Sequence, residues 1–157
     1  MAHFFAAIAY EKRVLLCEQY MGNLNGTLFS EFVRKYFPDL FKRSNNPKGK
    51  IFLQDGDPSQ NSRKARVAIL AVGASKFSIP ARSPDLNPIE NIFHLVKRQL
   101  HEDALEKYIM NETFEEFSDR IKRTMNNISI AVIDKTILSM DTRVTKIIQS
   151  KGNRIKY

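Results

Sequence analysis

The order of the apolar segments constrains the fold of this chain more than any other feature of its sequence. Four short apolar runs occupy residues 3–10, 14–20, 51–54 and 76–79, and each has the length and composition of a β-strand. Beyond residue 88 the apolar residues recur only at the three- and four-residue spacing of amphipathic helices. Strands joined partly by helices, and then helices alone, predict an α/β fold with both antiparallel and parallel strand pairs.

Helical spacing predicts five helices, over residues 27–41, 62–72, 88–108, 112–125 and 130–150. Pro38 is expected to end the first of them early, because proline lacks the amide hydrogen that a helix interior requires. Gly73 is expected to stop the second. The apolar face of the last helix is expected to comprise Ile133, Ile137, Met140, Val144, Ile147 and Ile148. The first two strands are separated only by a polar turn, residues 11–13, which predicts an antiparallel hairpin.

The charge of the chain indicates an anionic partner. Its 157 residues carry 25 Lys and Arg against 17 Asp and Glu, a formal net charge of +8, with an isoelectric point near 9.7. Residues 1–85 and 119–157 each carry a net charge of +6, whereas residues 86–118 carry −4. Nucleic acid is the usual partner of so basic a protein, and a basic protein that binds no nucleic acid is the alternative.

Several classes of protein are disfavoured by composition. An apolar content of 43% argues against a disordered chain. The apolar runs are far shorter than the roughly 18 residues of a membrane span, and the first residues lack the basic region of a signal peptide. The single cysteine, Cys17, excludes an internal disulfide and a cysteine-based zinc site, and it is expected to be a core residue of a buried strand. The sequence therefore predicts an intracellular protein.

Two acidic residues stand where catalytic carboxylates are expected. Asp55 directly follows the strand over residues 51–54, and sites collect at the carboxyl ends of strands in open α/β sheets. Glu90 lies in the first turn of the helix that begins at Pro88, with Asn87 as its N-cap. Such carboxylates can hold a hard divalent cation such as Mg²⁺. Two such ions about 4 Å apart can clamp the attacking and leaving oxygens of a phosphodiester, which would suit a nuclease or a strand-transfer enzyme.

Both carboxylates also have a purely structural interpretation. Asn87 and Glu90 have the spacing of a capping box, in which Glu90 would only close the start of the helix. The segment over residues 55–58, Asp-Gly-Asp-Pro, has the composition of a tight turn. Composition and spacing alone leave the two interpretations open.

Three segments resemble the DDE transposases of the mariner-like superfamily. They are QDGDPSQNS (residues 54–62), SPDLNPIENIF (83–93) and SMDTRVTKIIQSKGNRIKY (139–157). Thirty-four residues separate Asp55 from Glu90, which is the spacing of the second and third catalytic acids in one large branch of that superfamily. The resemblance runs from about residue 4 to the C-terminus. It implies an RNase H-like fold, with metal-dependent DNA cleavage and strand transfer as the ancestral activity.

The resemblance also implies roles for individual residues. Asp55 and Glu90 would be catalytic acids and ligands of Mg²⁺ or Mn²⁺. Asp57 would be the less favoured ligand of the QDGD pair, and Asp85 a structural part of the SPDLNP loop. DNA would be the partner, together with another transposase chain, and the location would be the nucleus. Neither a membrane nor a small-molecule substrate is expected.

Basic residues beside the Asp55 loop are candidates for contacts with DNA. Arg63, Lys64 and Arg66 follow that loop and could meet phosphates, and a solvated helix face is the alternative. The same two interpretations apply to Arg120, Lys122, Arg123, Lys146, Lys151, Arg154 and Lys156. Contacts of this kind would be sensitive to salt and would carry little sequence information.

The sequence departs from the family pattern in three ways. Ser59 and Gln60 replace the usual Lys-His after the second acid, and Phe93 replaces a Trp. No Asp precedes Asp39, whereas the family carries its first catalytic Asp on a strand ahead of the hairpin. We therefore expect residues 1–157 to be a partial RNase H-like DDE catalytic domain, from the second strand to the C-terminus, without the family's N-terminal helix-turn-helix domains.

The lack of that first strand has a physical consequence. In RNase H-like sheets it lies between the second and fourth strands, so the hairpin and the strand over residues 51–54 would have no shared neighbour and would leave backbone groups unpaired. Two acids alone also hold two metal ions poorly. The chain by itself is therefore expected to be a weak or inactive catalyst. The alternative function is a non-catalytic basic module that binds DNA or protein.

Overall fold

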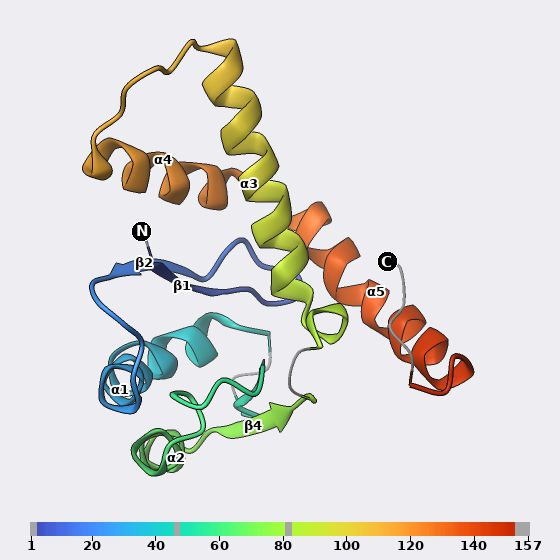
Figure 1. Cartoon of the computed structure of the whole chain (residues 1–157). Coiled ribbons are helices and arrows are strands. Elements are labelled where there is room, and N and C mark those ends of the chain that lie inside the picture. Colours follow the sequence, from blue (N-terminus) through green and yellow to red (C-terminus); the bar gives the residue numbers. More distant parts are fainter. Residues whose placement is uncertain (1–2, 46–47, 81–82, 153–157) are drawn as a thin grey trace. The chain divides into compact units, whose positions relative to one another are not determined.

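A computed structural model describes residues 3–45, 48–80 and 83–152 (Figure 1). The chain forms two compact units. Unit 1 comprises Met1–Met21 and Pro88–Met140, and unit 2 comprises Gly22–Asn87 and Asp141–Tyr157. Within the described ranges, none of the helices combines the length and the apolar character that crossing a membrane requires.

Unit 1 begins with the predicted antiparallel hairpin. Strand β1 (His3–Ala7) pairs with β2 (Leu16–Tyr20), with His3 opposite Tyr20 and Ala7 opposite Leu16. The connection is longer than the three-residue turn expected. At its centre Glu11 has φ 57°, and its backbone N–H donates to Asp134 Oδ1 at 2.7 Å. The hairpin is confirmed, and every residue of its two strands is half-buried.

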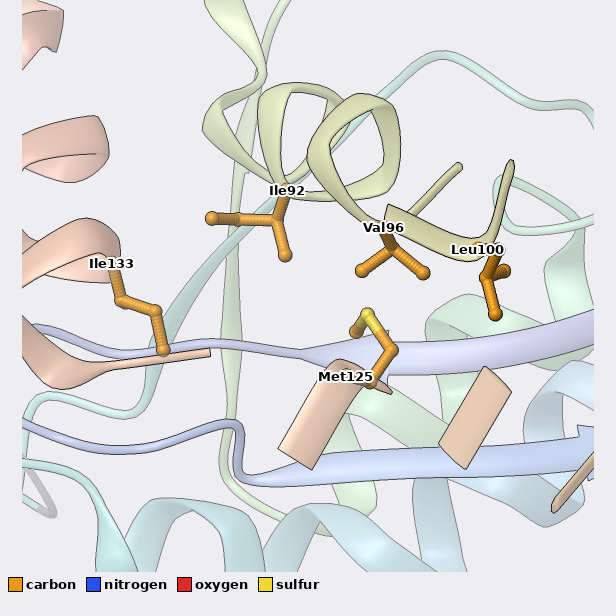
Figure 2. Close-up of a cluster of buried hydrophobic side chains, with 5 residues drawn as sticks. All are labelled: Ile92, Val96, Leu100, Met125 and Ile133. Atoms are coloured by element: carbon orange, nitrogen blue, oxygen red, sulfur yellow. The ribbon is translucent and has the colours of Figure 1, made fainter. Parts of the chain in front are cut away.

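Three helices supply the core of unit 1. They are α3 (Pro88–Glu106), α4 (Phe114–Asn127) and α5 (Ile130–Gln149), whose last residues belong to unit 2. Figure 2 shows Ile92, Val96 and Leu100 in a row on α3, with Met125 of α4 and Ile133 of α5 beside them. A spacing of four residues places the three α3 side chains on one helix face, as the sequence predicted.

Helix α4 begins two residues later than expected, and its N-cap explains the difference. The Thr113 hydroxyl accepts a hydrogen bond from the Glu116 N–H at 3.2 Å, and the Glu116 carboxylate accepts one from the Thr113 N–H at 2.8 Å. This is a capping box, which satisfies two of the amide groups that a helix start leaves unpaired. These hydrogen bonds also hold the pKa of the Glu116 carboxyl below its usual range.

The environment of Cys17 predicts an unreactive thiol. Burial raises its pKa from 9.0 to about 11, with Glu18 adding to the rise and Lys122 opposing it. Two pH units correspond to about 100-fold less thiolate, so at pH 8 iodoacetamide should alkylate the folded chain about 100-fold more slowly than the urea-unfolded chain. Because the Cys17 thiol ionises at a lower pH in the unfolded chain than in the folded one, the free energy of unfolding should fall as the pH rises from 9.0 toward 11. Equal alkylation rates would contradict the prediction, and Cys17→Ser gives the background.

Unit 2 contains a parallel strand pair with its crossover helix. Strand β3 (Ile51–Gln54) pairs with β4 (Ser75–Ser78), from Ile51 opposite Ser75 to Gln54 opposite Ser78. Helix α2 (Arg63–Ala71) connects them and ends as predicted at Gly73, whose φ is 68° and whose N–H donates to the Leu70 carbonyl at 2.9 Å. A short 3₁₀ helix, η1 (Pro84–Leu86), precedes α3.

Helix α1 (Gly26–Arg43) packs against α2 in the same unit. Its first residue, Gly26, lies so close to the N-cap of α2 that a Cβ on it would be 2.7 Å from the Cβ of Ser62 and would overlap the Ser62 hydroxyl. Only glycine fits there without displacing one of the two helix starts. The N-terminal ends of α1 and α2 therefore lie side by side.

Helix α1 continues through Pro38, so the expectation that this proline ends the helix early is wrong. Side chains beyond it are held in the core of the unit, where Leu40 and Phe41 are buried. The Phe37 ring meets the Phe41 ring edge-on at 5.8 Å between centroids and the Phe52 ring of β3 at 4.9 Å. Burial of these aromatic side chains outweighs the one hydrogen bond that proline removes.

Pro38→Ala is accordingly expected to stabilise unit 2. The proline ring is exposed, so its loss removes little packing, and alanine restores the hydrogen-bond donor. The free energy of unfolding should rise by about 2 kcal/mol, measured by urea denaturation followed by circular dichroism. Glu31→Ala, on an exposed position of the same helix, should leave stability nearly unchanged. A fall in stability on Pro38→Ala would show that the ring itself packs.

The described strands form two separate two-stranded sheets. One is β1–β2 in unit 1 and the other is β3–β4 in unit 2, and neither has a third strand among the residues described. Two-stranded sheets are marginally stable by themselves, so the helices of each unit must provide most of its stability.

Candidate active site

Asp55 is the first residue beyond β3, at the carboxyl end of a parallel strand pair, where the sequence placed it. Its side chain is half-buried. One carboxylate oxygen accepts a hydrogen bond from the Asp57 N–H at 3.3 Å, which is long for such a bond. A carboxylate offers about four acceptor positions, so this bond leaves Asp55 with capacity for other ligands.

Asp57 differs from Asp55 because its carboxylate is used within the loop. Its Oδ1 accepts hydrogen bonds from the Ser59 N–H, at 2.8 Å, and from the Ser59 hydroxyl. Its carbonyl oxygen accepts one from the Asn61 side-chain amide at 2.8 Å, and the Gln54 amide donates to the Gln60 carbonyl at 3.3 Å. The tight-turn interpretation therefore fits Asp57, whose side chain shapes the loop between β3 and α2.

The three candidate DNA contacts Arg63, Lys64 and Arg66 lie at the start of α2, and all are exposed. The Lys64 ammonium donates to the Thr27 hydroxyl at 2.9 Å, and Arg66 Nε donates to the Asn61 carbonyl at 3.2 Å. These hydrogen bonds hold two of the three cations beside the Asp55 loop. The positive end of the α2 dipole lies there as well.

A fourth cation at this loop was missed from the sequence. Lys76 stands on β4 opposite Phe52, and its ammonium donates to the side-chain oxygen of Asn61. Because the parallel register brings β4 alongside β3, the loop after β3 meets a residue 15 positions further along the chain. Only the register, which the sequence pattern does not fix, reveals this neighbour.

Glu90 lies in the first turn of α3, as expected, with its side chain half-buried. It belongs to unit 1, whereas Asp55 belongs to unit 2. Beside Glu90 in the chain, the side-chain oxygen of Asn91 is buried and has no hydrogen-bond partner among the described residues. Within unit 1, the Glu90 carboxylate and this unsatisfied amide oxygen are donors of the type that Mg²⁺ and Mn²⁺ prefer.

The loop before Glu90 is tightly held. In η1 the Leu86 N–H donates to the Ser83 carbonyl at 3.0 Å and the Asn87 N–H to the Pro84 carbonyl at 3.1 Å. Asp85 is buried, as its expected structural role requires. Its carbonyl oxygen accepts a hydrogen bond from Arg143 NH1 of α5 at 3.1 Å.

Arg143 was also missed, because the apolar face of α5 is shifted from the predicted one. The sequence placed Val144 and Ile148 on the buried side, but both are exposed, at 43% and 71%. Arg143 is only 5% exposed. A charged residue in an apolar stripe is normally assigned to the solvent side, so no pattern in the sequence indicated its burial.

Among the basic residues of the C-terminal part, Arg120 has a structural role. Its guanidinium pairs with the Glu112 carboxylate through two bonds of 2.7 Å and donates to the Leu100 carbonyl at 2.8 Å. This pairing lowers the pKa of Glu112 and raises that of Arg120. Lys122 and Arg123 line an open cavity of about 780 Å³ beside this pair, and Lys146 and Lys151 are exposed. Arg154 and Lys156 lie outside the described residues.

Comparison with known proteins places these features in a family. Residues 2–109 match the DDE superfamily endonuclease family. The Tcb2 transposase of Caenorhabditis briggsae is 31% identical over 107 residues, which cover 68% of this chain and 37% of that protein. The Tc3 transposase of Caenorhabditis elegans is 33% identical over 109 residues, covering 68% and 31%. The chain thus matches less than half of the length of these relatives.

The fold has solved counterparts. The catalytic domain of the Mos1 mariner transposase matches with a TM-score of 0.77 at 16% identity, covering 99% of this chain and 82% of that one. This likeness confirms the RNase H-like, mixed α/β fold that the sequence predicted. Because the family match over residues 2–109 covers more than half of the chain, the chain belongs to the DDE superfamily endonucleases.

Proposed function

We propose that this chain is the catalytic part of a transposase, in which Asp55 and Glu90 hold divalent cations for DNA cleavage and strand transfer. The observation that carries the proposal is the contrast between the two acids of the QDGD loop. The Asp57 carboxylate accepts two hydrogen bonds from Ser59. The Asp55 carboxylate accepts one long hydrogen bond and keeps acceptor capacity at the end of β3. The spacing of Asp55 and Glu90 and the SPDLNPIEN motif support their pairing.

Divalent cations are the cofactor class in this proposal. Structures of the Mos1 catalytic domain with Mn and with Mg are among the similar proteins. Oxygen donors from Asp55 and Glu90 fit Mg²⁺ or Mn²⁺, although the described residues contain no group of three or more His, Cys, Asp or Glu side chains that could hold a metal ion. When bound, such ions would stabilise charge on the attacking and leaving oxygens of the phosphodiester.

The remaining residues of the loop would orient the DNA. The hydrogen bonds of Asp57, Ser59 and Asn61 fix the loop, so that Asp55 is presented from a rigid support. Arg63, Lys64, Arg66 and Lys76 would meet phosphates beside it. Mos1 is known in a paired-end complex with a left transposon end, which supports DNA and a second transposase chain as partners here. Because its substrate in this proposal is DNA, the protein would be located in the nucleus.

Mn²⁺ titration followed by NMR tests the metal proposal. Mn²⁺ is paramagnetic and broadens amide signals close to it, so the amide signals of residues 55–57 and 89–92 should broaden together. Asp55→Asn should abolish the broadening in both stretches, because one shared site needs both acids, and Glu90→Gln should do the same. Asp141→Asn, an exposed acid on α5, is the matched control and should change nothing. If the signals near Glu90 still broaden in Asp55→Asn, or those near Asp55 still broaden in Glu90→Gln, the two acids do not share one site.

A second candidate is a basic module that binds DNA without cutting it, and the exposed cations at the start of α2 favour it. Both candidates predict DNA binding that weakens steeply with salt. Replacing Arg63 and Lys64 by Gln should weaken binding to duplex DNA and flatten its dependence on salt concentration. Salt-dependent DNA binding with no Mn²⁺ broadening at either acid would select the second candidate. Weak binding that does not vary with salt would exclude both.

A further inference from the structure

A buried guanidinium in α5 has no part in the function proposed so far. Arg143 is 5% exposed, while Val144 beside it and Ile148 are left exposed. An arginine is rarely buried unless polar groups receive its charge, because removing a guanidinium from water is unfavourable. An apolar residue at this position would pack without that penalty. The burial of Arg143 therefore indicates a specific task for its donors.

One acceptor of Arg143 lies in the loop that leads to Glu90. Arg143 NH1 donates at 3.1 Å to the main-chain carbonyl of Asp85, the central residue of η1. Two residues of that loop are buried, Asp85 at 7% and Asn87 at 8% exposure, whereas Pro84 is exposed. A charged donor to a main-chain carbonyl in a buried setting is stronger than a neutral hydrogen bond. The contact fixes the backbone at Asp85, five residues before Glu90. Arg143 and Asp85 are 58 positions apart in the chain.

We propose that Arg143 is a positioning residue: it holds the turn Pro84–Leu86 and thereby sets the start of α3, on which Glu90 lies. Only two residues, Pro88 and Ile89, separate Asn87 from Glu90, whose carboxylate must be oriented, and Pro88 restricts the backbone between them. When η1 is held in place, the backbone that follows it has few allowed directions, and the orientation of the first helical turn of α3 is limited accordingly. The part of this inference that concerns Glu90 as a metal ligand rests on the proposed function, whereas the part that concerns the turn does not.

Hydrogen exchange tests the contact with the turn. Arg143→Met keeps an unbranched apolar stem but removes the guanidinium donors, so the Leu86 and Asn87 amides should exchange roughly tenfold faster than in the wild type. Arg143→Lys keeps a charged donor and should restore part of the protection. Lys146→Met, one turn further along α5 and exposed, is the matched control and should leave both amides unchanged. Unchanged protection of Leu86 and Asn87 in Arg143→Met would overturn the proposal.

Mn²⁺ broadening separates this inference from the proposed function. In Arg143→Met the broadening of the amide signals of residues 89–92 should fall several-fold, and Arg143→Lys should recover part of it. Broadening equal to that of the wild type would overturn the positioning of Glu90. If the wild type itself shows no broadening, the proposed metal site fails, and exchange at Leu86 and Asn87 still decides whether Arg143 holds the turn. If amide hydrogen exchange in Arg143→Met rises uniformly across unit 2, Arg143 only contributes to the overall stability of the unit, and the proposal is overturned.

Discussion

Ile92→Ala is expected to lower the free energy of unfolding by about 3–4 kcal/mol. The Ile92 side chain is fully buried in α3 and lies in one cluster with Val96, Met125 and Ile133 (Figure 2). These neighbours come from three different helices, so they cannot close together over the space left by the missing atoms. The loss therefore includes both the transfer of apolar surface from water and the energy of a cavity.

Urea denaturation followed by circular dichroism measures this effect. Leu105→Ala is the matched control, because Leu105 lies on the same helix and is 63% exposed. Its change should stay within about 0.5 kcal/mol. Equal losses for the two variants would mean that α3 packs through a different face. A change in the dependence of the unfolding free energy on urea would show instead that the two units unfold separately.

Most of the fold could be predicted because strong local signals agree with the packing. The hairpin, the parallel pair, the stop at Gly73 and the start of α3 at Pro88 all follow from residue spacing and from glycine and proline. The prediction that Pro38 ends its helix was wrong because contacts with residues far away in the chain keep α1 helical beyond the proline. Phe37 and Phe41 contact Phe52 of β3, and no spacing within the helix announces that contact.

The candidate site could be predicted only as far as its motifs reach. Asp55 and Glu90 lie in recognisable strings, but the difference between Asp55 and Asp57 depends on which carboxylate the loop itself uses. Lys76 and Arg143 were missed for a related reason. Both act through partners far away in the chain, Asn61 and the Asp85 carbonyl, and side-chain type gives no sign of such a partner.

The largest functional effect is expected from a third acidic residue on an added strand. In the proposed function Asp55 and Glu90 are two acids, whereas a two-metal site needs more ligands. The chain alone should therefore nick supercoiled DNA at most at a trace rate with Mg²⁺ or Mn²⁺. Fusing to its N-terminus the strand that carries the first Asp in a mariner-like transposase should raise the rate by roughly 100-fold or more.

Two variants of the fused chain separate the acid from the strand. A fused strand with Asn in place of its Asp can still pair and stabilise a sheet, so it should raise the melting temperature without raising the nicking rate. Asp55→Asn in the fused chain should return nicking to the trace level, because the gain requires all the acids together. Each nicking rate is measured on the same supercoiled plasmid, with EDTA as the metal-free control.

The results that would contradict this prediction differ in what they imply. Robust nicking by the 157-residue chain alone, abolished by Asp55→Asn, would mean that the retained acids suffice and that the chain is an active catalyst. Nicking that the Asn-bearing strand raises as much as the Asp-bearing one would make the strand a purely structural support. If the fused chain gains stability and keeps its Mn²⁺ broadening but gains no nicking, the metal site assembles while DNA does not reach it. The exposed cations of α2, Arg63, Lys64 and Arg66, would then be the residues to test next, because they flank the loop that presents Asp55.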